Sequence, residues 1–273
     1  MSVLPPDLAG ALELGLRNLL FWSLKLGLIA WAAAVVARVL PVDHPGPRLA
    51  LWQGLLVLGL VLPALQPWRT AIAGVDWTLG LAPTSPAPSP ALAAATTDVS
   101  LGLPWAPIVA VALLSGASLL LGRLVLGLVR LRVIRRTARA LAAPPWLDDL
   151  RAQVAPAARF VTSDRCPGPA TFGARRPTIV LPTTFGSMPR DRQRAVALHE
   201  LIHARRRDWP VLLVEELVKA TLFFHPAVHW VVGRARLARE QCVDAEVVQS
   251  LGGRRTYLES LVEVARLAGR AQA

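Results

Sequence analysis

Three long stretches almost free of charged residues dominate the first half of this chain. The 20 residues between Arg17 and Arg38 contain one charge, Lys25. Residues 49–68 and 99–122, which are 20 and 24 residues long, contain none. A helix that crosses a membrane needs about 20 mainly apolar residues, so three such windows argue against a buried soluble core. We expect transmembrane helices near residues 18–38, 49–68 and 106–128.

Basic residues are distributed unevenly along the chain. Residues 1–130 hold 7 Lys and Arg against 5 Asp and Glu, whereas residues 131–273 hold 23 against 13. Of the net charge of +12, +10 therefore lies in the second part. No helix-turn-helix or RNA-binding signature accompanies this charge, so we expect no direct nucleic-acid partner. A domain beside anionic lipid explains it, with the lipid bilayer as partner.

The basic residues near the span ends also predict the orientation of the chain, because cytoplasmic segments collect Lys and Arg. The segment 69–105 carries a single Arg, while five arginines lie between residues 130 and 139, after the third span. We therefore expect an outer, proline-rich loop at 69–105 and an N-terminus outside. Residues 1–130 would form a transmembrane anchor, and 131–273 a cytoplasmic domain. The acidic residues Asp7 and Glu13 precede the first apolar run, so we expect no cleaved signal peptide.

Four of the five histidines lie between residues 199 and 229, and two of them belong to the motif His199-Glu200-Leu-Ile-His203. The sequence predicts a helix here that opens at residues 187–189 and closes at Pro210. Residues four apart share a helix face, so both imidazoles can bind one metal ion. Zinc suits such ligands and leaves a position for water, from which Glu200 can take a proton. The pattern predicts one catalytic Zn2+ ion; the alternative is a solvated arginine-rich helix with incidental histidines.

A catalytic zinc ion needs a third protein ligand, and Glu240 on a predicted helix over 234–247 is the candidate. Asp244, one turn later on the same face, is expected to hold a ligand imidazole in its tautomer. The alternative is that Glu240 only pairs with Arg236 four residues earlier. Between the histidines and Glu240, residues 220–233 are 14 charge-free residues, about 21 Å of helix. That length is too short to cross a membrane, so we expect a membrane-dipping helix near 210–233.

Several further residues are candidates for supporting roles. His225, His229 and Tyr257 are unranked candidates for donating to an oxyanion or contacting substrate. The run 178–181 is either an edge strand to which a substrate adds, or a core strand without that role. Cys242 is expected to pack rather than bind metal. Asp208 is expected to pair with one of the arginines at 205–207.

Three blocks carry a family resemblance: HELIHARRRDW (199–209), FFHPAVHWVVGRARLAREQCVDAEVV (223–248) and FGARRPTIVLP (172–182). They resemble the BlaR/MecR family of membrane-embedded antirepressor metallopeptidases. The resemblance implies a mainly α membrane protein with about three transmembrane helices. These would be joined to a cytoplasmic α+β zincin-like (gluzincin) domain with a small sheet before the zinc helix. It also implies a bacterial inner-membrane location, zinc bound by His199, His203 and Glu240, and Glu200 as general base.

The chain departs from the family pattern in two respects. Val243, rather than a cysteine, directly precedes Asp244, and no sensor domain follows within these 273 residues. A separate sensor protein is therefore an expected partner, beside a protein or peptide substrate such as a transcriptional repressor.

Three functions fit these observations. The first is a zinc endopeptidase that acts in regulated proteolysis or signal transduction. The second is a housekeeping quality-control protease for membrane proteins, and the third is a non-catalytic membrane transducer that contains zinc. Glu200 argues against the third, because a closed structural zinc site needs no general base.

Overall fold

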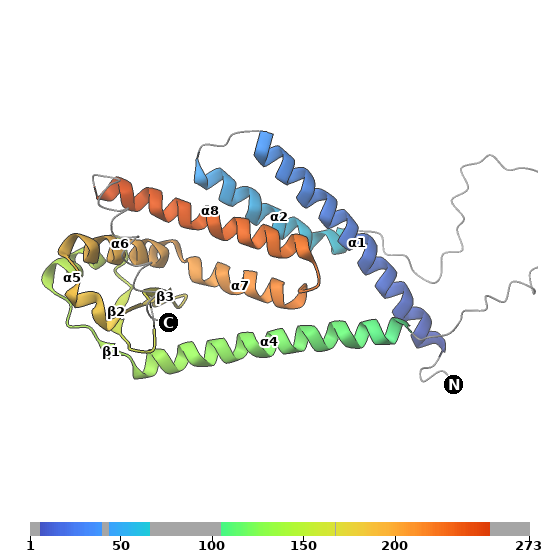
Figure 1. Ribbon diagram of the computed structural model, residues 1–273, viewed down its shortest axis with the longest axis horizontal. Coiled ribbons are helices and arrows are strands. Elements are labelled where there is room, and N and C mark those ends of the chain that lie inside the picture. The colour runs from blue at the N-terminus through green and yellow to red at the C-terminus, as the bar shows by residue number, and fades with distance from the viewer. Residues whose placement is uncertain (1–5, 40–43, 66–104, 167, 252–273) are drawn as a thin grey trace, which may run out of the picture.

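The computed structural model describes residues 6–39, 44–65, 105–166 and 168–251, which are mainly helical with one small sheet (Figure 1). The long helices are α1 (Pro6–Val39), α2 (Pro45–Leu65), α4 (Trp105–Thr137), α6 (Arg190–Arg206), α7 (Asp208–Thr221) and α8 (Pro226–Ser250). A shorter helix, α5, spans Pro145–Val154, and a 3-10 turn spans Thr183–Ser187. The expected mainly helical fold is confirmed.

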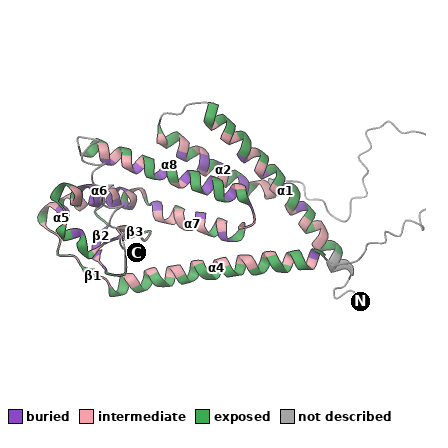
Figure 2. Cartoon of the chain, viewed as in Figure 1, coloured by how far each residue is buried: buried purple, intermediate pink, exposed green. Residues whose placement is uncertain are grey.

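The helices α1, α2 and α4 are long and apolar enough to cross a membrane, over Gly10–Val39, Pro45–Pro63 and Trp105–Thr137. Many of their large apolar side chains face outward, as the exposed positions along α1 and α4 show (Figure 2). Leu24 of α1 and Leu114 of α4 are 62% and 69% exposed. Apolar surface on this scale is typical of helices that face lipid. The three candidate spans expected from the sequence are confirmed. The expected loop at 69–105 lies outside the described residues, except for Trp105, which begins α4.

The sheet lies at one end of the molecule, and the starts of α1 and α4 lie at the other end (Figure 1). Its strands are β1 (Arg139–Ala140), β2 (Arg159–Thr162), β3 (Ala170–Phe172) and β4 (Thr178–Leu181), in the order β1-β2-β4-β3. Strands β2 and β4 are parallel, and the two outer pairs are antiparallel. All four residues of β4 are buried and β4 lies between β2 and β3, so of the two alternatives for 178–181 the core strand is confirmed and the edge strand is wrong. An uninterrupted apolar run is typical of a strand covered on both faces. The edge strands are β1 and β3.

The predicted boundaries around residues 207–233 differ from the structure in two places. Helix α6 ends at Arg206, and the next residue, Arg207, has a φ of 56° in the left-handed region. Pro210 lies in the first turn of α7. Pro210 therefore does not close the zinc-motif helix. The segment 210–233 is not one helix either, because α7 ends at Thr221 and Pro226 begins α8 after a tight turn. Proline suits this first position, where its missing N–H has no helical partner.

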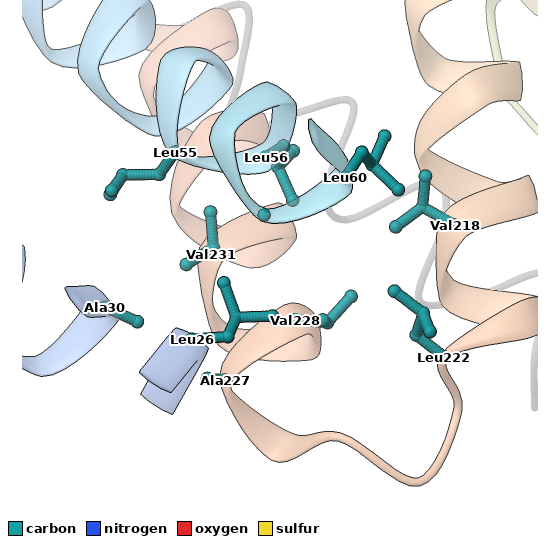
Figure 3. A pocket seen from close by; sticks show the side chains of 11 residues that line it. Leu26, Ala30, Leu55, Leu56, Leu60, Val218, Leu222, Ala227, Val228 and Val231 are labelled. Atoms are coloured by element: carbon teal, nitrogen blue, oxygen red, sulfur yellow. The ribbon is translucent and has the colours of Figure 1, made fainter. Parts of the chain in front are cut away.

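The hairpin of α7 and α8 packs among the candidate spans through apolar contacts. Val231 of α8 lies against Trp52 of α2, and Leu26 of α1 lies against Val218 and Val228 of the hairpin. These helices enclose an apolar hollow of about 20 Å³ (Figure 3). Helix α8, which bears Glu240, thus packs directly on the candidate spans α1 and α2.

Gly116 marks the point where α4 meets the turn between α7 and α8. A Cβ atom added at Gly116 would overlap the ring of Phe223, whereas one added at Gly122 would meet nothing within 4 Å. We predict that Gly116→Ala is less stable than Gly122→Ala by about 1–3 kcal/mol, because the turn must shift. Thermal unfolding in detergent measures the difference. Phe223→Leu should restore part of the loss, and equal stability of the two alanine variants would contradict this contact.

Candidate metal centre

Helix α6 presents His199 and His203 on one face, with ring centroids 4.8 Å apart. The opposite face carries Ala197 and Leu201, which are fully buried against the sheet and α5. Burial of this apolar face fixes the rotation of α6 about its axis. The two imidazoles therefore point away from the sheet core, toward Glu240 of α8.

The three predicted ligand side chains converge. Nε2 of His199 lies 3.1 Å from Nε2 of His203, and each lies 3.6 Å from Oε2 of Glu240. A tetrahedral ion with ligand bonds of about 2.0–2.1 Å needs donor atoms about 3.3 Å apart. The observed spacing fits one small four-coordinate cation, and Glu240 is not paired with Arg236, which contacts Glu216 instead.

The other ring nitrogen of each histidine faces a carboxylate. Nδ1 of His203 lies 2.8 Å from Oδ2 of Asp208, and Nδ1 of His199 lies 3.3 Å from Oδ1 of Asp244. A proton on Nδ1 that is shared with a carboxylate leaves the Nε2 lone pair free for a metal ion. The geometry thus prepares both imidazoles to bind metal through Nε2.

Asp208 is the partner that the sequence did not reveal. It contacts Arg206 as expected, at 3.4 Å, but its carboxylate is 6% exposed and also lies beside His203. The left-handed residue Arg207 reverses the chain direction at the end of α6 and brings Asp208 back toward the preceding turn. A positive φ at an arginine has no sequence signature, so only the structure identifies this contact.

The carboxylates around the histidines favour positive charge at this position. Burial lowers the pKa of His199, but Asp244 and Glu240 outweigh it and raise this pKa to about 9. Burial has the same effect on His203, and Asp208 and Glu240 raise its pKa to about 9. Contacts with His199 and His203 in turn lower the pKa of Glu240 far below its usual range. A cation that binds here must displace protons from the imidazoles.

Glu200 is 7% exposed and is held in place by Thr171 of β3. The Thr171 hydroxyl donates a hydrogen bond of 2.6 Å to Oε2 of Glu200. Thr171, Trp209 and Leu212 line, together with the histidines and Glu240, a pocket of about 330 Å³. Thr171 lies 29 residues from Glu200 in the chain, so no local spacing indicated this pair.

The remaining candidates have other partners. His225 is buried against Trp22, and its Nε2 lies 3.0 Å from the Ser23 carbonyl oxygen of α1. Nε2 of His229 lies 2.9 Å from the Phe223 carbonyl oxygen. Neither histidine lines the pocket that contains His199 and His203. Cys242 packs in the cluster between α2 and α8, while Tyr257 lies outside the described residues.

A buried arginine, Arg239, lies beside the carboxylate of Asp208, which contacts His203. Arg239 is 1% exposed, forms two hydrogen bonds with Glu215 and has Nε 3.8 Å from Oδ1 of Asp208. Glu215 is 2% exposed. Removing one partner from such a buried set costs about 3–5 kcal/mol. The arginine links α7 and α8 to the carboxylate that contacts His203.

Comparison with known proteins agrees with this geometry. The protein named "Regulatory protein BlaR1" of Bacillus licheniformis is 34% identical over 83 residues, which cover 30% of this chain and 14% of that protein. Residues 82–272, more than half of the chain, match the family described as BlaR1 peptidase M56. With its three membrane-type helices and its His-His-Glu cluster, the chain belongs to the BlaR1 peptidase M56 family of membrane metallopeptidases.

Proposed function

We propose that this protein is a membrane-embedded zinc endopeptidase that hydrolyses peptide bonds. The observation that carries the proposal is the convergence of Nε2 of His199, Nε2 of His203 and Oε2 of Glu240 within 3.1 to 3.6 Å. Imidazole and carboxylate together suit zinc, and three protein ligands leave a fourth position open. These three residues would hold the ion. When bound, zinc lowers the pKa of water and polarises a peptide carbonyl.

Glu200 acts as general base in this proposal. The hydroxyl of Thr171 occupies Oε2, so Oε1 is the oxygen available to the proton of the attacking water. Glu200 then passes the proton to the amine that leaves. Thr171 keeps the carboxylate in one orientation, which a catalytic base needs and a closed structural site does not. This contact favours an enzyme over a non-catalytic transducer.

A protein substrate fits the edge of the sheet that carries Thr171. Strand β3 is the outermost strand on the side of α6, and an extended peptide can add to such an edge through backbone hydrogen bonds. We assign this role to β3 rather than to the buried β4. A transcriptional repressor is the substrate we favour, because the matched Bacillus licheniformis protein is named as regulatory. General quality control of membrane proteins is the alternative, and a separate sensor would supply the signal.

The proposed location is the bacterial inner membrane, with residues 1–130 mainly as anchor and the metal centre in the cytoplasm. Five arginines between 130 and 139 support this orientation. The turn at Phe223 packs on Gly116, which lies 11 residues after Trp105 within the third candidate span. The hairpin of α7 and α8 would therefore dip into the membrane, and the metal centre would lie near its inner surface.

Substitution of Glu200 tests catalysis separately from metal binding. We predict that Glu200→Ala keeps one zinc ion per chain and loses activity by about 100-fold or more, since only proton transfer is removed. His203→Ala should lose both. Zinc analysis and cleavage of a candidate repressor and of a membrane-protein mixture measure these effects. Glu246→Gln, which removes the partner of Arg205, is the matched control. Equal cleavage by wild type and Glu200→Ala would refute the mechanism.

Substitution of Asp208 tests whether its contact with His203 helps to bind zinc. We predict that Asp208→Asn lowers zinc affinity by about 10- to 100-fold, because His203 loses the carboxylate that orients it. Competition with a chromophoric chelator gives the affinity. Asp148→Asn removes an exposed carboxylate that pairs with Arg151 and should leave the affinity unchanged. An unchanged affinity in Asp208→Asn would show that His203 is not a ligand.

Reporter fusions test the orientation. A fluorescent protein fused after Ala273 should fluoresce, because the proposed domain lies in the cytoplasm. Alkaline phosphatase, which is active only outside the cytoplasm, should be active when inserted within 69–105 and inactive after Ala273. The reverse pattern would place the metal centre outside the cell.

A further inference from the structure

A second hollow lies on the outer side of α1, α2 and α8, away from the metal centre. Its volume is about 390 Å³, and each of the three helices contributes one arginine: Arg38 from α1, Arg48 from α2 and Arg234 from α8. Each helix also contributes one tryptophan: Trp31, Trp52 and Trp230. Among the residues that the structure describes, no acidic side chain lines the hollow. It therefore combines three positive charges with apolar aromatic walls.

These arginines differ from the others on the same helices. Within residues 6–39, 44–65, 105–166 and 168–251, none of Arg38, Arg48 and Arg234 contacts a carboxylate, whereas Arg236 and Arg239 of α8 both do. The guanidinium of Arg234 instead lies over the Trp230 ring, 5.4 Å from its centroid. Three cations around one hollow repel each other unless an anion lies among them. The charge of the hollow therefore matches an anionic ligand.

The position of the hollow indicates where that anion would come from. Arg38 lies in the last turn of α1, and Arg48 lies near the start of α2, so the hollow is at the ends of two candidate spans. Because α2 runs away from this end, Trp52 lies one turn deeper than Arg48. Tryptophans beneath a layer of arginines are typical of the interface between lipid and water.

The other two helices repeat this arrangement. Trp31 precedes Arg38 on α1, and Trp230 precedes Arg234 on α8, and both of these helices run toward this end (Figure 1). Trp52 and Trp230 are in edge-to-face contact, with ring centroids 5.1 Å apart. Trp31 is 64% exposed, as a residue in contact with lipid would be. In all three helices the tryptophan therefore lies on the membrane side of the arginine.

We propose that this hollow binds the headgroup of an anionic phospholipid from the leaflet on the side of the metal centre. The guanidinium groups of Arg38, Arg48 and Arg234 donate to the phosphate oxygens, a geometry that suits arginine. The acyl chains lie along Trp31 and Trp230. An acidic peptide would match the charge but not the tryptophans, which lie at the depth of the acyl chains. This site depends on the membrane location of the chain and not on its peptidase activity.

Native mass spectrometry of the full chain in detergent tests the proposal. We expect wild type to retain phosphatidylglycerol over phosphatidylcholine with the same acyl chains. Arg48→Gln and Arg234→Gln should each weaken phosphatidylglycerol binding about fivefold, the effect of one cation beside an anionic lipid. Arg48→Lys should retain most of the binding. The matched control is Arg132→Gln, at an exposed arginine of α4 outside the hollow, and it should bind as wild type does.

Three results would overturn the proposal. Equal retention of the two lipids by wild type would show no headgroup preference. An equal loss in Arg132→Gln and Arg234→Gln would show general attraction by the basic surface. Displacement of the lipid by an excess of soluble glycerol phosphate would show that the site binds a free phosphate group. Circular dichroism confirms that each variant is folded, and zinc content is expected to stay unchanged in all of them.

Discussion

The structure around the metal centre depends on one buried cation, Arg239. Its guanidinium binds Glu215 of α7 and lies near Asp208 at the start of that helix, while the next residue in the chain is Glu240. A charge that is 99% buried is stable only if its partners remain in place. Arg239 therefore fixes the height and rotation of α8 relative to α7. The same constraint positions Glu240 opposite the two histidines of α6.

The metal ligands come from helices with different surroundings. Helix α6 is anchored by the sheet and α5, through side chains such as Leu201, whereas α8 is anchored by α2, through Trp52 and Val231. Helix α8 also packs directly on α6, where Val243 and Val247 are buried together with Ile202. Contacts with α6 and with α2 therefore both set the distance from the histidines to Glu240. A part of the chain without α1 and α2 would keep the contact with α6 but lose the apolar surface that covers the other side of α8.

Much of the fold and the central cluster could be predicted from the sequence, because both leave patterns within short stretches of the chain. Charge-free windows indicated the spans, and spacing of four residues placed His199 and His203 on one face. Contacts that depend on turns or on long chain separation could not be predicted. Asp208 reaches His203 through the positive φ at Arg207, and Thr171 reaches Glu200 from an edge strand. The tight turn before Pro226 was also missed, since an apolar run by itself does not show where a helix reverses.

Helix α4 connects the membrane-spanning part of the chain almost directly to the sheet. It is continuous over 33 residues, about 50 Å, and only Ala106 along it is buried. A single residue, Ala138, separates its end from β1, which pairs with β2 of the sheet. This one-residue connection is too short to let α4 tilt independently of β1. A change in the tilt of α4 would therefore shift β1, which lies at the edge of the sheet opposite β3 and Thr171.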